Sequence, residues 1–312
     1  MPTFRVEFQA MASTCEIIVA AADAVAAQAW SRRAMEEVWR IEHKYSRYRD
    51  DSVVARINTA AGSDWVACDA ETLALFDYAG KLYVTSDGLF DITSGVLRRA
   101  WNFRQPQVPS EDAVDRLRAL IGWPRVERDG ARIRLPRQGM EIDFGGFGKE
   151  YAADRAADTL AASGACHGYV NLAGDMRFVG ARPDGQPWQI GIQHPRAREA
   201  LVATLPMTQG ALATSGDYER YFELEGRRYC HVLHPATGWP VTHWRSVSVK
   251  APLAIVAGGL ATIAMLKEQG ALEFLDQAGV DYLAIDHTGA AYRNGDQHPS
   301  GGTFIERDDS LG

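Results

Sequence analysis

The stretch E-I-D-F-G-G-F-G-K-E-Y-A-A-D-R-A-A-D, residues 141–158, decides how the chain folds around its centre. Apolar and polar residues alternate from residue 140 to residue 144, which predicts a short strand. Two glycines then lead into an alanine-rich helix, and glycines at such a turn let the backbone approach a ligand closely. The first amides of a helix lack partners within it and lie at the positive end of its dipole. This turn therefore suits a phosphate, to which Lys149 would add a positive charge.

The same pattern is equally typical of a tight strand-to-helix connection followed by a solvated lysine. Neither the P-loop pattern G-x-x-x-x-G-K-[ST] nor the dinucleotide pattern G-x-G-x-x-G occurs in it. The turn alone does not identify a ligand.

The composition is that of a globular chain. The 312 residues carry a net charge of -7 and no block of lysine and arginine, which argues against a nucleic-acid partner. No apolar run approaches the ~20 residues that a membrane-spanning helix needs. The first residues lack the basic and apolar segments of a secretory signal, so we expect a cytoplasmic protein, although a processed periplasmic chain would look the same. The four cysteines form no C-x-x-C pair, which favours reduced thiols over disulfides or zinc.

The predicted elements place the chain in the α+β class. Helices are expected over residues 23–44, 52–58, 70–86, 111–121, 252–267 and 271–278. Strands occur among them without strict alternation, so we predict mixed sheets covered by helices. We take residues 1–312 as a single domain, with two lobes that meet near residue 165. Residues 295–312 are polar and predict a loosely held tail.

Four polar sites could carry chemistry, but each has an ordinary structural explanation. Asp91 precedes a predicted helix and is more often a cap than a ligand. Residues 214–217, T-S-G-D, are typical of a turn, and His231 in a β-rich run is more often a hydrogen-bonded core histidine than a base. Thr262, in the middle of a helix, normally bonds back to a carbonyl one turn earlier. No Ser-His-Asp spacing, H-E-x-x-H pattern or Cys/His cluster is present.

The order of seven short motifs along the chain is far more specific than any one of them. They are S-R-Y-R (46–49), G-L-F-D (88–91), D-F-G-G-F-G-K (143–149), V-N-L-A-G-D (170–175), A-T-S-G-D-Y (213–218), H-V-L-H-P-A-T-G-W-P (231–240) and L-A-T (260–262). In this order the chain resembles the ApbE family of FAD:protein FMN transferases, from Met11 to about Ala278.

The resemblance implies an activity and a set of site residues. Members of this family bind FAD in a cleft between two lobes and use magnesium to move FMN onto a threonine or serine of a target flavoprotein, with release of AMP. The implied FAD-binding residues are Met11, Tyr48, Leu89, Phe90, Asp91, Gly145, Tyr151 and Val232. The implied metal ligands are the side chain of Thr262 and the backbone oxygens of Gly148 and Ala261. His231 corresponds to the histidine proposed to help deprotonate the acceptor hydroxyl. Attack on a phosphoanhydride needs a hard cation with oxygen ligands and a proton acceptor, and these residue types supply both.

The sequence departs from the family pattern at the implied metal site. The family signature A-D-A-L-A-T reads A-G-G-L-A-T at residues 257–262, so Gly258 replaces the aspartate that is the charged magnesium ligand. Glu150 replaces a glycine or similar small residue, and His234 replaces the acid of H-x-L-D-P. Magnesium binding relies on carboxylates and substrate phosphates, so it would be weakened or lost unless another acid substitutes; Glu150 and Asp217 are the candidates. A Gly258→Asp variant is then expected to gain activity.

Three functions stay open on the sequence alone. The first is a magnesium-dependent FMN transferase that acts on a target flavoprotein. The second is a non-catalytic FAD-binding accessory protein whose metal site has decayed. The third is an FAD pyrophosphatase, in which water replaces the protein hydroxyl.

Overall fold

The computed structural model describes residues 1–294, and the tail predicted at residues 295–312 lies outside them. Its largest sheet is antiparallel between all neighbouring strands. The strand order is β1 (Thr3–Ala10), β2 (Ser13–Ala20), β6 (Gly168–Leu172), β7 (Asp175–Gly180), β10 (Gly210–Gly216), β13 (Trp244–Ala251), β14 (Asp281–Asp286) and β15 (Ala291–Arg293).

Three small sheets and a set of helices complete the described part of the chain. The small sheets are β3 (Val66–Ala67) with β5 (Arg132–Arg134) and β4 (Glu127–Asp129), β8 (Trp188–Gln193) with β9 (Leu201–Met207), and β11 (Tyr221–Leu224) with β12 (Arg227–Cys230). The α-helices are α1 (Ala24–Tyr45), α2 (Val53–Thr59), α3 (Ala70–Thr85), α4 (Glu111–Arg118), α5 (Gly148–Ala162), α6 (Ala254–Lys267) and α7 (Ala271–Ala278). Short 3-10 helices are η1 (Ile92–Arg99), η2 (Trp123–Arg125) and η3 (Glu268–Gly270).

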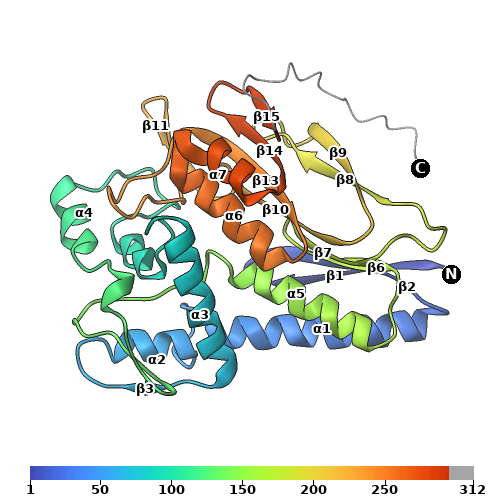
Figure 1. The fold of residues 1–312 in the computed structure, drawn as a ribbon, viewed down its shortest axis with the longest axis horizontal. Coiled ribbons are helices and arrows are strands. Elements are labelled where there is room, and N and C mark those ends of the chain that lie inside the picture. Colours follow the sequence, from blue (N-terminus) through green and yellow to red (C-terminus); the bar gives the residue numbers. More distant parts are fainter. Residues whose placement is uncertain (295–312) are drawn as a thin grey trace.

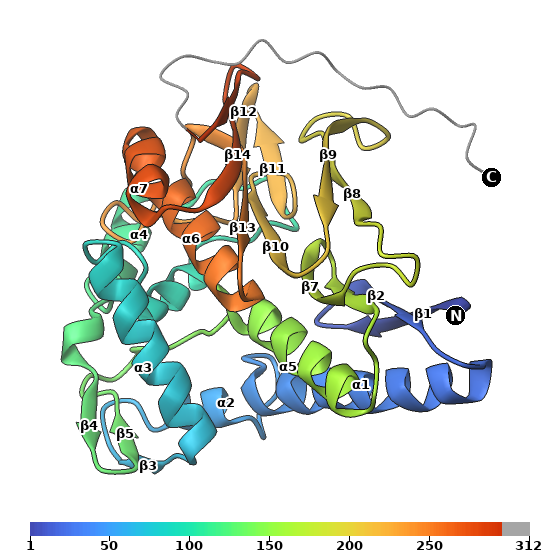
Figure 2. The same cartoon turned by 45° about the vertical axis from the view of Figure 1, so that its right-hand side comes forward.

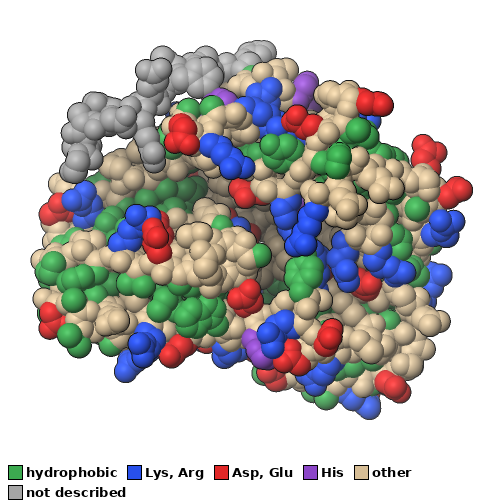
Figure 3. All heavy atoms as spheres, turned by 180° about the vertical axis from the view of Figure 1, so that it is seen from behind, with side chains coloured by type: hydrophobic (Ala, Val, Ile, Leu, Met, Phe, Trp, Pro, Cys, Tyr) green, Lys and Arg blue, Asp and Glu red, His purple; other side chains and the backbone are tan. Residues whose placement is uncertain are grey.

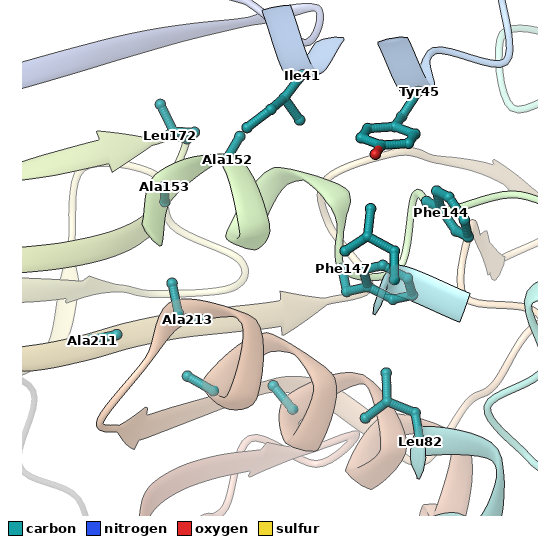
Figure 4. Close-up of a cluster of buried hydrophobic side chains, with 14 of the residues drawn as sticks. Ile41, Tyr45, Leu82, Phe144, Phe147, Ala152, Ala153, Leu172, Ala211 and Ala213 are labelled. Carbon is teal, nitrogen blue, oxygen red and sulfur yellow. The ribbon is translucent and has the colours of Figure 1, made fainter. Parts of the chain in front are cut away.

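Helices α1, α5 and α6 cover one face of the large sheet, and the β8–β9 hairpin lies on its other face (Figure 1 and Figure 2). Figure 4 shows Ala152 of α5 close to Ile41 of α1, and Phe144, in the loop before α5, close to Tyr45. Alanines on α5 leave room for the neighbouring helix, so the apolar side chains of both helices enter one core.

The long helices form where the periodicity predicts them. The buried residues of α1 recur every three or four positions, and Asp23 accepts a hydrogen bond of 2.8 Å from the amide of Ala26 at its start. Ser52, the first residue of the helix predicted at residues 52–58, caps α2 and accepts from the amide of Ala55 at 2.9 Å. Local sequence signals therefore account for these boundaries.

The strand predicted at residues 140–144 is wrong, although the predicted alternation of burial is present. Its backbone is bound by a side chain instead of a neighbouring strand. The backbone amide of Ile142 donates to the side-chain oxygen of Asn58 at 2.7 Å. The side-chain amide of Asn58 donates to the carbonyl of Ile142 at 3.0 Å. The amide of Asp143 donates to the carbonyl of Ile92. The segment is extended and buried without being part of a sheet.

The turn predicted at residues 214–217 is also wrong for its first three residues, which belong to β10. Thr214 pairs with Ser248 and Gly216 with Ser246 of β13. The amide of Thr214 is bound on the other side by the carboxylate of Asp175, at 3.2 Å. Pairing with the sheet overrides the turn preference of these small residues.

The α+β class and the sheets covered by helices are confirmed. A lobe boundary near residue 165 does not match the large sheet, because β2 pairs with β6 across that position. A division into two lobes stays a prediction. Among residues 1–294, no helix is long and apolar enough to cross a bilayer.

Candidate functional site

The glycine turn before α5 is shaped by an aromatic ring packed against it. A Cβ on Gly146 would lie 2.7 Å from Cζ of Phe90, closer than real Cβ atoms approach other atoms, so glycine fits there without displacing the ring. Phe90 is buried and stacks on Phe147, with 6.2 Å between the ring centres. Helix α5 then begins at Gly148 without a side chain that caps its first amides. The predicted helix start is therefore present. The amide of Gly148 donates to the carbonyl of Phe144 at 2.7 Å, so the donors suited to an anion are the amides that follow it in the first turn.

Asp143 ties this turn to the loop that follows α1. One of its oxygens accepts from the amide of Gly145 at 2.9 Å, and the other is paired with Arg47. Arg47 also donates to the hydroxyl of Tyr48 at 2.7 Å and lies over that ring. Tyr48 is 75% exposed, so its ring is open to a ligand. Gly145 and Tyr48, both predicted to bind FAD, are thus linked through Asp143 and Arg47.

Lys149 points from the start of α5 towards a buried carboxylate. Its ammonium lies 2.8 Å from Oδ2 of Asp175, the first residue of β7. The other oxygen of Asp175 accepts from the amide of Thr214. Burial lowers the pKa of Lys149, but the negative charges of Asp175 and Glu150 outweigh this and hold the pKa above its ordinary value. The lysine stays charged where α5, β7 and β10 meet.

The carboxylate of Glu150 fills the space beside Gly258 on α6. A Cβ on Gly258 would lie 2.5 Å from both Cγ and Oε1 of Glu150 and 2.7 Å from its Cδ. Glu150 is buried, and its Oε2 has no hydrogen-bond partner. Burial raises the pKa of this carboxyl, and the charge of Asp175 raises it further. Two positions that depart from the family pattern therefore touch each other.

Asp154 holds the start of α6 against α5. It lies one turn after Glu150 on α5 and accepts hydrogen bonds from the amides of Ala254 and Ile255, at 2.8 and 2.9 Å. A carboxylate at this position satisfies two amides that the helix itself cannot. The cap fixes which face of α6 meets Glu150.

The three residues predicted to bind a metal stand close to Glu150 and Gly258 along the chain. Gly148 is two residues before Glu150, while Ala261 and Thr262 lie about one turn after Gly258. The hydroxyl of Thr262 shares a hydrogen bond of 2.8 Å with Ser215 of β10. The structure therefore directs this hydroxyl towards the sheet, and not back to a carbonyl of its own helix as expected.

His231 follows β12 and lies in a field of positive charge. Its amide donates to the carbonyl of Arg220 at 3.0 Å, while Nδ1 is buried without a hydrogen-bond partner. Burial and then the charge of Arg220 lower the pKa of His231 to about 3, and Lys149 and Arg47 act in the same direction. The imidazole is therefore neutral near pH 7, as a proton acceptor must be, and a bound anion would raise its basicity by offsetting these charges.

Met11 lies at the turn of the first hairpin, in strained backbone. Met11 and Ala12 have φ values of 52° and 58° in the two-residue turn between β1 and β2. Glycine, asparagine and aspartate are usual at such positions, so the surrounding structure imposes this turn. The amide of Met11 donates to Glu42 of α1 at 2.7 Å, which anchors it.

Asp91 acts as a cap, the more frequent of its two roles. Its Oδ1 accepts from the amide and the hydroxyl of Thr93, and its Oδ2 accepts from the amide of Trp123 at 2.9 Å. Leu89 packs against the main core nearby. A direct contact of Leu89 and Asp91 with FAD stays a prediction. Because both carboxylate oxygens of Asp91 already accept hydrogen bonds, FAD would have to contact its backbone or one of these occupied oxygens.

Tyr151 and Val232 are also used within the fold. The hydroxyl of Tyr151 donates to Glu71 of α3 at 2.8 Å, and Val232 is buried in the main core. Their contact with FAD likewise stays a prediction.

Asp217, the other acid considered as a substitute metal ligand, is engaged elsewhere. Its two oxygens accept from Arg196 at 2.7 and 2.6 Å, and Arg228 lies 3.5 Å away. Within residues 1–294, no group of three or more His, Cys, Asp or Glu side chains could hold a metal ion. A cation beside Thr262 would therefore depend on a single carboxylate together with hydroxyl and carbonyl oxygens.

The surface is hollowed in several places. Figure 3 shows a recess in the middle of one face, with lysine and arginine side chains gathered along one side of it. Two further hollows are lined by α1 and α2, including Trp39 and His43, and by β8, β9, β13 and β14, including Ile192. None of the predicted site residues lines either of these two.

Three residues that build this site have no role predicted from the sequence: Arg47, Asp175 and Asp154. Arg47 and Asp175 stand in the motifs that carry the resemblance, but only the structure shows their ion pairs with Asp143 and Lys149. For Asp154 a signal was available, because two acids four positions apart in an alanine-rich helix share one face.

The chain is similar to known proteins along most of its length. Residues 11–284 match the model of the ApbE family. An FAD:protein FMN transferase of Vibrio cholerae is 32% identical over 258 residues, which cover 80% of this chain and 76% of the relative. One of Salmonella typhimurium is 31% identical over 275 residues, covering 84% and 78%. The crystal structure of the ApbE protein from Thermotoga maritima matches with a TM-score of 0.88 and 30% identity, covering 94% of this chain and 97% of that one. The flavinyl transferase ApbE from Pseudomonas stutzeri matches with a TM-score of 0.83 and 28% identity, covering 94% and 95%.

Proposed function

The chain belongs to the ApbE family, and we propose that it is an FAD:protein FMN transferase that moves FMN from FAD to a threonine or serine of a target flavoprotein. The observation that carries this proposal is that relatives of that name align with four-fifths of the chain, at 80% and 84% coverage. The uncapped start of α5 and the charged Lys149 support it, because they suit the pyrophosphate of a dinucleotide.

The reaction breaks one phosphoanhydride bond and forms one phosphoester bond. The acceptor hydroxyl oxygen attacks the phosphorus of the FMN half. The bond from that phosphorus to the bridging oxygen breaks, and AMP leaves with the bridging oxygen. A ring nitrogen of His231 takes the hydroxyl proton, which its neutral imidazole is able to do. Lys149 and the first amides of α5 hold the phosphates during this exchange.

Magnesium is the cation that we propose for this site. The hydroxyl of Thr262 and the carbonyls of Gly148 and Ala261 would hold it. These oxygens, together with the buried and unpartnered Oε2 of Glu150, fit a hard cation. When bound, such a cation offsets the charge that develops on the phosphates.

The test weighs a target protein after incubation with the purified chain, FAD and magnesium chloride. A gain equal to one FMN, absent from a target whose acceptor threonine is changed to valine, is the expected result. Release of AMP without this gain would indicate an FAD pyrophosphatase. Bound FAD with neither product would indicate an accessory protein. Either of these outcomes contradicts the transferase proposal.

We place the activity in the cytoplasm as part of the same proposal. All four cysteines are free: Cys15, Cys68, Cys166 and Cys230. Free thiols are typical of a reducing compartment. Fractionation of cells that make the natural protein tests this, and recovery in the periplasmic fraction would contradict it.

A further inference from the structure

We propose that Glu150 of α5 provides the carboxylate ligand of a divalent cation at Thr262, in the space that a side chain at position 258 of α6 would otherwise occupy. The inference deepens the proposed function and rests on it only for the use of a divalent cation. It assigns the charged ligand to a different helix from the one that carries Thr262.

The first observation is the shared space. A Cβ built on Gly258 would lie 2.5 Å from Cγ and Oε1 of Glu150, and real Cβ atoms essentially never come within 3.0 Å of another atom. The carboxylate of Glu150 therefore occupies the volume that any side chain at position 258 would enter. With glycine at 258, Glu150 reaches the face of α6 without displacing anything.

The second observation is an unsatisfied oxygen. Oε2 of Glu150 is buried and has no hydrogen-bond partner, whereas buried carboxylates are normally paired or bound to a metal. Lys149, the adjacent cation, is directed to Asp175 at 2.8 Å. The hydroxyl of Tyr78, a nearby donor, is also used elsewhere, because it donates to the carbonyl of Ile255 at 2.7 Å. Within residues 1–294, Glu150 is the only acid with a buried side-chain oxygen that lacks a partner.

The third observation is the alignment of the two helices. Asp154 on α5 caps α6 at Ala254, and Glu150, one turn earlier on α5, meets Gly258, one turn later on α6. The next turn of α6 carries Thr262, so its hydroxyl follows the carboxylate along the contact. An oxygen from a carboxylate and an oxygen from a hydroxyl are thus presented by neighbouring helices.

The other acids nearby are committed to other partners. Asp154 accepts from two amides of α6, Asp175 pairs with Lys149, and Asp217 pairs with Arg196. Removing any of them from its partner would leave an uncompensated charge or open helix amides. Glu150 is the carboxylate that a cation could take without breaking an existing bond.

The test measures binding of Mn²⁺ by its electron paramagnetic resonance signal, with the full chain and with ADP as an unreactive pyrophosphate. We expect Glu150→Gln to weaken Mn²⁺ binding by at least about tenfold, because the amide keeps the shape and removes the charge. The matched control Asp217→Asn also changes an acid to its amide and is expected to leave the affinity unchanged. The double variant Glu150→Ala with Gly258→Asp moves the carboxylate back to α6 and is expected to restore binding.

Unchanged Mn²⁺ affinity in Glu150→Gln overturns the inference, as does a natural chain that binds no Mn²⁺. Thermal unfolding with and without Mn²⁺ gives a second readout, in which the rise in Tm on adding the metal is lost in Glu150→Gln only. The transferase proposal is decided separately, by whether the natural chain adds FMN to the target. If FMN is added while Glu150→Gln binds Mn²⁺ normally, only the ligand assignment fails.

Discussion

A single substitution, Gly258→Asp, tests the contact between α5 and α6 without any ligand. Its Cβ would start 2.5 Å from Cγ and Oε1 of Glu150, so one of the two side chains must move. Overpacking of this kind costs about 1–3 kcal/mol. The new carboxylate would also stand beside a buried one, and two unit charges ~4 Å apart repel by about 4 kcal/mol at an effective dielectric constant of ~20. We expect the free energy of unfolding to fall by about 5–7 kcal/mol at a pH where both groups are charged.

The loss should depend on pH in a defined direction. Two carboxylates in one site raise each other's pKa, so the folded variant holds protons that the unfolded chain releases. The free energy of unfolding then decreases as the pH rises above the unfolded pKa of about 4. Burial already raises the pKa of Glu150 in the natural chain, which gives a slope of the same sign. The variant should show a steeper slope than the natural chain.

Urea denaturation in the presence of EDTA measures both effects, at about pH 5.5 and about pH 8. Gly258→Ala adds the Cβ without the charge and isolates the packing loss. Adding Glu150→Ala to Gly258→Asp should recover most of the stability at the higher pH. A Gly258→Asp variant as stable as the natural chain at both pH values would refute the position assigned to the Glu150 carboxylate. The sequence alone predicts that Gly258→Asp gains activity, and the structure changes that expectation: we now expect a gain only where Glu150 is removed as well.

The remaining predictions concern Lys149, Gly146 and His231. Lys149→Met leaves Asp175 buried without its cation and should lower the free energy of unfolding by about 3–5 kcal/mol in urea denaturation. Adding Asp175→Asn should recover stability but not FAD affinity. Full FAD affinity in the double variant would contradict a phosphate role for the lysine. Gly146→Ala places a Cβ 2.7 Å from the ring of Phe90 and should weaken FAD binding in a fluorescence titration. Undiminished binding in this variant would count against the turn as part of the site. His231→Asn should slow FMN transfer by about 10²–10⁴-fold with the Kd for FAD unchanged. Because burial lowers the pKa of His231 to about 3 in the folded chain, the natural protein should gain stability as the pH rises from about 3 to about 6.5, and an acid-denaturation series that shows the same gain in His231→Asn would refute this cause.

Much of the fold follows from signals that are local in the sequence. Helix α1 begins after Asp23 and buries every third or fourth residue, and the hairpin β11–β12 turns at Glu225 and Gly226, where both φ values are positive. Helices and hairpins of this kind are specified by periodicity, caps and turn residues that lie within a few positions of one another. Their prediction needs no knowledge of the rest of the chain.

The errors arise where a distant residue replaces a local partner. Residues 140–144 alternate like a strand, but the side chain of Asn58 satisfies the backbone of Ile142, so no neighbouring strand is needed. Thr214 stands in a turn-like sequence, but pairing with β13 and the carboxylate of Asp175 keep it extended. These partners lie more than thirty residues away in the chain, where no short-range pattern shows them.

The candidate site shows the same division. The resemblance selects His231 and Thr262 by their motifs, but it gives neither the positive field that keeps the imidazole neutral nor the hydroxyl partner of the threonine. It also presents Gly258 as the loss of a ligand and Glu150 as a separate substitution. That the two share one space is a property of the packed helices, and it changes the meaning of both substitutions.

A cation responds to where an oxygen lies and not to which helix carries it, so the residues at positions 150 and 258 should act as one unit. The natural pair, Glu150 with Gly258, supplies one carboxylate, and the exchanged pair, alanine with aspartate, also supplies one. Glu150→Ala alone supplies no carboxylate. Gly258→Asp alone supplies two carboxylates, although the space between the helices holds only one. The effects of the two substitutions on Mn²⁺ binding and on stability should therefore be strongly non-additive across these four chains. Residues in contact show coupling energies of about 0.5–3 kcal/mol, and we expect a value at the upper end of this range. Additive effects across the cycle would mean that the two positions act independently, and the packing of α5 on α6 would then have no bearing on the metal.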